Sequence, residues 1–302
     1  MNIALAHSGE SHPQTVPEVS LLTDWSFDPA FLPVAAVALL YYLGLRAYRR
    51  QGGRRFPRWR PPLFAAGVII VAVALLSPVD VLAEYSFTWH MFQHQWLMMG
   101  GVPLIMLGAP FIPVIRGIPR RWRWKWFVPF AKNRAVRAAL IFGTRPMIAL
   151  LFMNFVVLVW HWPAFYDLAL RNEAAHYLEH FAFVLSAGLF WWNIVTPYPF
   201  KGRIDYPMRM VLMFLSSIFN TVLGAMVTFA DVVLYGYSRQ VEFWGMTMEI
   251  EQELGGLLMW TGGGMLHLAG LTGVFFTYAY RERRKEPPRA MYLTRDGAPA
   301  KH

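Results

Sequence analysis

Seven long apolar stretches alternate with shorter polar segments along the chain. Each approaches or exceeds the roughly 20 residues that a helix needs to cross a hydrocarbon core of about 30 Å. Because a backbone in lipid must satisfy its own hydrogen bonds, each stretch predicts a transmembrane helix. The fold class expected is therefore all-α, a polytopic bundle of about seven membrane helices. The stretches lie at 29–46, 63–82, 89–115, 147–166, 175–196, 208–230 and 254–280.

The polar segments at the two ends of the chain set the expected domain organisation. Residues 1–28 form a polar tail, and the tail at 281–302 is charged and contains proline. We expect a single membrane domain at 29–280 between them, with no separate soluble domain.

The distribution of basic residues predicts the orientation. Lys and Arg number seven at 46–62, nine at 116–146, three at 197–209 and seven at 281–302, and these segments share one side if the spans alternate. The positive-inside rule makes that side cytoplasmic, with the N-terminus outside and the C-terminus inside. The net charge of +10 is then a membrane-facing charge that meets anionic lipid, which argues against nucleic acid as a partner.

The chain contains no cysteine. This excludes disulfides, zinc–thiolate and iron–sulfur sites, and nucleophilic catalysis by a thiol.

Six of the nine histidines fall within the apolar stretches, where ionisable residues are rare and costly. His90 and His94 are four residues apart, and so are His176 and His180, so each pair shares one helix face. His161 lies at the end of the fourth stretch. With the orientation above, these five imidazoles lie on three helices near the outer surface, and we predict that they form a metal site. A single pair could instead have no metal, with each imidazole hydrogen-bonded to a backbone carbonyl.

Other side chains offer further ligands or partners for the imidazole rings. Imidazole suits copper, zinc and iron, whereas thioether selects Cu(I), so Met98 favours copper. Asp231, Asp167, Glu179 and Asn154 are candidates either as further ligands or as partners that orient ring N–H groups. His267 lies deeper in the last span, where we expect a packed, hydrogen-bonded side chain. The acidic turn Glu249–Glu253 either complements its own helix dipole or forms an entry port for a cation.

Several of these segments, taken in order, resemble the CtaG family of cytochrome c oxidase assembly factors, a group of seven-helix bacterial membrane proteins. The resemblance covers nearly the whole membrane region and implies a role in forming the copper centre of the oxidase. The family usually carries an Asp-Gln pair before the Gly-Gly step, where this chain has Glu251-Gln252-Glu253. The matching segments are His90-Met91-x-x-His94, His161-x-Pro163-x-x-Tyr166-Asp167-x-Ala169-Leu170, His176-x-x-Glu179-His180, Trp191-Trp192, Leu234-Tyr235-Gly236-Tyr237 and Gly255-Gly256-Leu257-Leu258-Met259-Trp260.

The leading hypothesis is a non-enzymatic assembly factor in the bacterial plasma (inner) membrane. It would receive copper, Cu(I) being favoured, from a periplasmic copper donor and pass it to the oxidase subunit that carries an extracytoplasmic copper site. Two alternatives stay open. A membrane di-iron oxidoreductase also uses H-x-x-x-H pairs, but usually with more histidines and on the cytoplasmic side. A haem-b protein would use imidazoles from facing helices as axial ligands.

Overall fold

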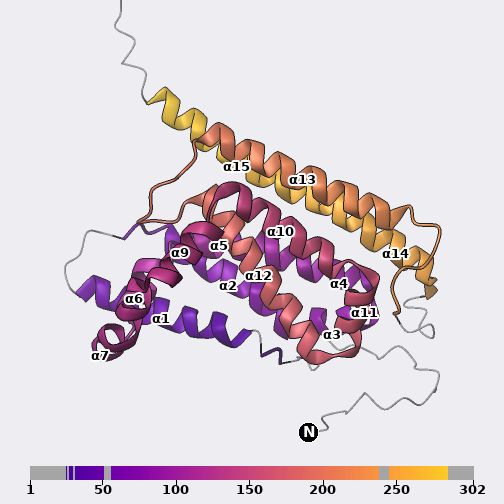
Figure 1. Cartoon of the computed structure of the whole chain (residues 1–302), viewed down its shortest axis with the longest axis horizontal. Coiled ribbons are helices and arrows are strands. Elements are labelled where there is room, and N and C mark those ends of the chain that lie inside the picture. The colour runs from indigo at the N-terminus through magenta and orange to yellow at the C-terminus, as the bar shows by residue number, and fades with distance from the viewer. Residues whose placement is uncertain (1–24, 26, 30, 51–55, 238–244, 285–302) are drawn as a thin grey trace, which may run out of the picture.

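The computed structural model describes residues 25, 27–29, 31–50, 56–237 and 245–284, and the regular structure within these ranges is helical throughout (Figure 1). The α-helices are α1 (Phe31–Arg50), α2 (Arg60–Leu76), α3 (Pro78–Tyr85), α4 (Phe87–Gln95), α5 (Val102–Leu107), α6 (Phe111–Gly117), α7 (Arg120–Trp122), α8 (Val128–Lys132), α9 (Arg134–Gly143), α10 (Pro146–Trp160), α11 (Pro163–Arg171), α12 (Glu173–Val195), α13 (Tyr206–Thr228), α14 (Met248–Leu257) and α15 (Gly263–Arg283). Wider π-helical turns occur at η1 (Trp96–Gly101), η2 (Arg123–Phe127) and η4 (Leu258–Gly262).

Within the described residues, three helices are long and apolar enough to cross a membrane by themselves, namely α1, α12 and α13. Three bent pairs meet the same test when each pair counts as one span, which raises the number to six. The all-helical membrane class is thus confirmed. The seventh expected span corresponds to α14, η4 and α15, and the count of seven and the orientation stay predictions.

The expected spans at 63–82 and 147–166 are not continuous helices, and this corrects the prediction made from hydropathy. The first is bent by 46° between α2 and α3, and the second ends at Trp160, before α11 begins at Pro163. Proline lacks the N–H that would continue the ladder and forces the preceding residue into an extended conformation. Ser77, before Pro78, and Trp162, before Pro163, both adopt that conformation. The stretch at 89–115 is also broken, with a bend of 75° before α6.

The helices α13 and α15 lie side by side along one edge of the molecule, and α1 lies near the opposite edge (Figure 1). Small residues allow α13 to approach α14 and η4 closely. A Cβ added to Gly224 would lie 2.9 Å from the backbone nitrogen of Trp260, and one added to Gly256 would lie 2.7 Å from that of Thr228. Contacts this short leave no room for a side chain, which agrees with the role of small residues at membrane helix interfaces.

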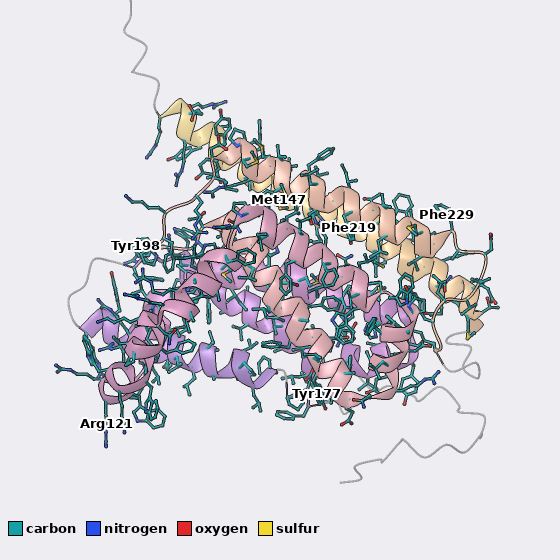
Figure 2. The ribbon with its side chains drawn as sticks, in the orientation of Figure 1. Arg121, Met147, Tyr177, Tyr198, Phe219 and Phe229 are labelled. Atoms are coloured by element: carbon teal, nitrogen blue, oxygen red, sulfur yellow. The ribbon has the colours of Figure 1, made fainter. Side chains whose placement is uncertain are left out.

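The long axis of the bundle separates two ends with different character. Arg121 in α7 lies towards one end, as does Tyr198, which precedes α13. Phe229 lies towards the other end (Figure 2). Helices α3, α4, α11 and α14 also gather at the Phe229 end (Figure 1). Large apolar side chains such as Phe155, Phe214 and Phe276 are exposed between the ends, as expected of a surface that faces lipid.

The acidic turn at the start of α14 has a structural role that the sequence left open. Glu251 is buried, and its carboxylate accepts hydrogen bonds from the Ser86 hydroxyl at 2.7 Å and from the backbone N–H of Thr88 at 3.2 Å. Both donors belong to the N-terminus of α4, where unsatisfied N–H groups and the helix dipole favour an anion. Glu251 therefore caps the neighbouring helix α4, which carries two of the candidate ligands.

Replacing Glu251 with Ala should destabilise the protein by about 1–3 kcal/mol, because it leaves the Ser86 hydroxyl and the Thr88 N–H without their acceptor. Thermal unfolding of the purified protein in detergent measures this as a fall in Tm of roughly 2–4 °C per kcal/mol. Glu253→Ala is the matched control, since Glu253 is exposed on the same helix. Equal melting temperatures for the two variants would contradict the capping role.

Candidate metal centre

Two histidine pairs on neighbouring helices face each other. The rings of His90 and His94 on α4 have centroids 4.3 Å apart, as do those of His176 and His180 on α12. Across the helices, His90 lies 5.7 Å from His176 and His94 lies 5.6 Å from His180. Four of the five imidazoles predicted from the sequence therefore form one compact group, which we call the imidazole cluster.

Local sequence features explain why each helix presents its pair. Ser86 caps α4 by accepting a hydrogen bond from the N–H of Trp89, and Asn172 caps α12 by accepting one from the N–H of Ala175. These residues are preferred at helix N-termini because their side-chain oxygens satisfy the first free N–H groups. Both caps place the histidine pairs in the first turns, where a spacing of four residues stacks them on one face.

Glu179 lies in the middle of the cluster. Its Oε2 is 3.8 Å from Nε2 of His90, and its Oε1 is 3.8 Å from Nε2 of His94. One ligand atom from each of these three residues can be chosen so that all lie within 4.8 Å of one another, close enough for one metal ion. The sequence offered Glu179 either as a further ligand or as a partner for ring N–H groups, and the structure points its carboxylate at the same space as the imidazole nitrogens.

Hydrogen bonds behind the rings determine which nitrogens face this space. Nδ1 of His180 lies 2.8 Å from Oδ2 of Asp28, and Nδ1 of His90 lies 3.3 Å from the carbonyl of Ala83. An acceptor at Nδ1 holds the proton there and leaves Nε2 with a free electron pair. A carboxylate behind a histidine is the usual outer partner of a metal-binding imidazole. Asp28, which lies in the segment expected to be a polar tail, was not identified from the sequence.

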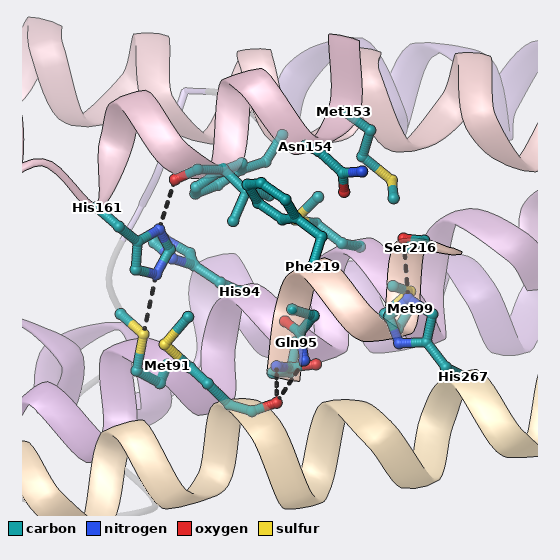
Figure 3. A pocket seen from close by; sticks show the side chains of 15 residues that line it. Met91, His94, Gln95, Met99, Met153, Asn154, His161, Ser216, Phe219 and His267 are labelled. Atoms are coloured by element: carbon teal, nitrogen blue, oxygen red, sulfur yellow. Dashed lines mark hydrogen bonds between the residues drawn. The ribbon is translucent and has the colours of Figure 1, made fainter. Parts of the chain in front are cut away.

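The fifth histidine, His161, is near the cluster but points elsewhere. It follows the last residue of α10, its Nδ1 donates to the carbonyl of Val157 at 2.7 Å, and its Nε2 faces Sδ of Met91 at 3.4 Å (Figure 3). That His161 shares the metal site of the other four imidazoles stays a prediction, and in the structure its Nε2 faces Met91. His161 lies at the break before Pro163, where α10 ends.

The other residues singled out from the sequence divide into two groups. Met98 and Asn154 line a cavity of about 40 Å³ together with His94, and neither has a hydrogen bond or ion pair to the cluster among the described residues. Asp167 instead accepts a hydrogen bond from the N–H of Gly236, and Asp231 is exposed just beyond the end of α13. His267 is buried and bonded to Ser216 and to the Gly263 carbonyl, in agreement with the expected packed histidine.

Three tyrosines support the cluster. Tyr166 packs against the ring of His90 at 5.2 Å and its hydroxyl bonds to that of Tyr237. The Tyr237 hydroxyl also donates to the carbonyl of Ala83, and the Tyr235 hydroxyl donates to the carbonyl of His161. In the sequence these tyrosines stood out only as part of the segments that resemble the family, and the structure adds that they help to position the cluster.

Residues 39–281 match the sequence profile of the cytochrome c oxidase caa3 assembly factor family. The chain belongs to this family. The matched region contains all four histidines of the imidazole cluster, Glu179 and the three supporting tyrosines, whereas Asp28 precedes it.

Curated relatives include uncharacterized proteins of Mycobacterium leprae, 24% identical over 288 residues, and Mycobacterium bovis, 26% identical over 287 residues. Each alignment covers 91% of this chain but only 42% of the relative, so the chain spans less than half the length of these proteins. No solved structure matches the chain.

Proposed function

We propose that this protein handles copper during the assembly of cytochrome c oxidase, binding one ion in the imidazole cluster. His90, His94 and His180 would bind through Nε2, with His176 and Glu179 completing the set of ligands. Bound there, copper would be held without thiolate, in a site from which it can be exchanged. We propose no catalytic reaction for the protein.

The observation that carries this proposal is a buried, unneutralised group of electron-pair donors. Both oxygens of Glu179 and the Nε2 atoms of His90, His94, His176 and His180 are buried with no hydrogen-bond partner among the described residues. A carboxylate without hydrogen bonds costs several kcal/mol to bury, and the Nε2 atoms of His90 and His94, at 3.8 Å, are too far away to donate one. A cation bound among these atoms would supply the missing compensation.

The chemistry of the donors and the family supports copper over other metals. Imidazole and carboxylate bind zinc, copper and iron, and affinity among divalent first-row metals is greatest for copper. Thioethers line the adjacent cavity, and they favour Cu(I). The family's role in assembling cytochrome c oxidase also suggests copper as the metal.

The recipient we propose is the oxidase subunit that carries an extracytoplasmic copper site, with a copper donor outside the cytoplasm upstream. This requires the cluster end of the bundle to face outwards in the plasma membrane. The basic segments support that orientation, because 116–146 and 197–209 belong to the end that contains Arg121 and Tyr198 (Figure 2). The lipid bilayer is the remaining partner.

Metal analysis of the purified full chain tests the proposal. We expect about one Cu(II) per chain after equilibrium dialysis, with nitrogen hyperfine coupling in its electron paramagnetic resonance spectrum. We also expect cells that lack the protein to make oxidase with less copper.

Several outcomes would contradict the proposal. They are a chain that binds no copper, a deletion strain whose oxidase has its normal copper content, and purified protein that carries a pair of iron ions or shows the Soret band of haem. The last two would favour the di-iron and haem alternatives respectively.

A further inference from the structure

The contact between His161 and Met91 joins two groups that both present electron pairs. Nδ1 of His161 donates its proton to the carbonyl of Val157 at 2.7 Å, so Nε2 carries a free pair. That nitrogen faces the thioether sulfur of Met91 at 3.4 Å, and sulfur here is only an acceptor. Both side chains are buried. Two buried acceptors facing each other gain nothing from the contact unless a cation lies beside them.

The separation of the two atoms suits adjacent ligands of one metal ion. With metal–nitrogen bonds of roughly 2.0 Å and metal–sulfur bonds of roughly 2.3 Å, as for zinc, tetrahedral ligands lie roughly 3.5 Å apart. The observed 3.4 Å is close to that value. Neither side chain would need to move far to bind the same ion.

The surroundings of this pair are rich in thioethers and contain space. The cavity of about 40 Å³ is lined by His161, Met91 and four further methionines, Met98, Met99, Met153 and Met259 (Figure 3). This volume exceeds the roughly 10–15 Å³ that a water molecule needs. An ion beside His161 and Met91 would therefore have room and further sulfur ligands within the same cavity.

Helix α4 separates the two sets of ligands. His90 and His94 point from one face towards α12, whereas Met91 points from another face towards His161. His94 also lines the methionine-rich cavity, so the two places are neighbours. One short helix thus presents imidazole ligands on one side and a soft thioether ligand on the other.

We propose that His161 Nε2 and Met91 Sδ form a second, Cu(I)-selective site, separate from the imidazole cluster. Thioether ligands select Cu(I) among the metals that imidazole binds. The choice of copper as the metal rests on the proposed function, whereas the ligands of this second site are different residues. Each chain would then bind one ion when it is loaded with Cu(II) and two ions when it is loaded with Cu(I).

Anaerobic titration of the purified full chain with Cu(I), in competition with a chromophoric chelator, tests this. We expect about two Cu(I) per wild-type chain and about one for Met91→Leu, while Cu(II) binding by the cluster is unchanged. X-ray absorption of the Cu(I)-loaded wild type should show copper–sulfur scattering that Met91→Leu loses. Met213→Leu is the matched control, because Met213 is buried in the same bundle but does not line the cavity, and it should behave as wild type.

Undiminished Cu(I) binding and copper–sulfur scattering in Met91→Leu would overturn the second site. A wild type without copper–sulfur scattering would overturn it too, and this is the result expected if water fills the cavity. His161→Gln is the second variant should Met91→Leu fail to fold, and it should also lose one Cu(I). The result also separates the two proposals. A wild type that binds no Cu(II) but shows Met91-dependent Cu(I) binding would refute the cluster and support the second site.

Discussion

Replacing His94 or His180 with Ala should abolish Cu(II) binding by the cluster, with a loss of affinity greater than about 100-fold. The two rings come from different helices and lie 5.6 Å apart, so each variant removes one side of the site. Loss of an outer partner of a ligand typically costs 10–100-fold in metal affinity, and loss of the ligand itself should cost more. Equilibrium dialysis followed by metal analysis measures the effect.

The matched control is His267→Ala. His267 is another buried histidine, but its nitrogens bond to Ser216 and Gly263 and it lies outside the cluster. This variant should lose stability and keep its copper. Since truncating a buried ring also leaves a cavity, His94→Gln provides a second test with smaller loss of volume. If folded His94→Gln and His180→Ala hold Cu(II) as tightly as wild type, the cluster is not the binding site.

The second large effect should come from Glu179→Gln, which we expect to stabilise the metal-free protein while removing its response to copper. In the metal-free chain, the buried carboxylate faces His90 and His94 at 3.8 Å without a hydrogen bond from a described residue. A neutral amide of the same shape avoids that cost, which should raise the free energy of unfolding by about 1–4 kcal/mol.

With copper present, only the wild type should gain stability. A ligand at 100 times its Kd stabilises the folded protein by about 2.7 kcal/mol, and the variant loses this gain with its anionic ligand. Thermal unfolding of both proteins, with and without Cu(II), gives the four melting temperatures required. Glu173→Gln is the matched control, because Glu173 is exposed on the same helix. A less stable metal-free Glu179→Gln, or one that retains the copper-induced shift, would show that the carboxylate is structural.

The helical class and the two histidine pairs were predictable because both depend on short-range order. Long apolar stretches predict membrane helices, and a spacing of four residues places His90 beside His94 and His176 beside His180 whatever the tertiary structure. The breaks at Ser77-Pro78 and Trp162-Pro163 were also predictable from proline. Hydropathy averaged over a whole stretch does not register such breaks, so it predicts continuous spans.

The long-range partners could not be obtained in this way. Glu251 and Thr88 are 163 residues apart, and Asp28 and His180 are 152 apart. Nothing in the spacing of either pair indicates contact. The sequence left open whether Glu251 complements its own helix dipole or forms an entry port for a cation. The structure places its carboxylate at the N-terminus of another helix, α4.

Which residues share a helix face follows from their spacing alone, because the period of the α-helix is a local property of the backbone. Spacing was therefore enough to predict the two histidine pairs and the soft and borderline ligands from which a copper site could be made. That α4 and α12 bring these pairs together around Glu179, and that His161 faces Met91, is visible only in the folded chain. Those choices depend on helix packing and on where prolines break the spans, so they arise from contacts between segments distant in the chain.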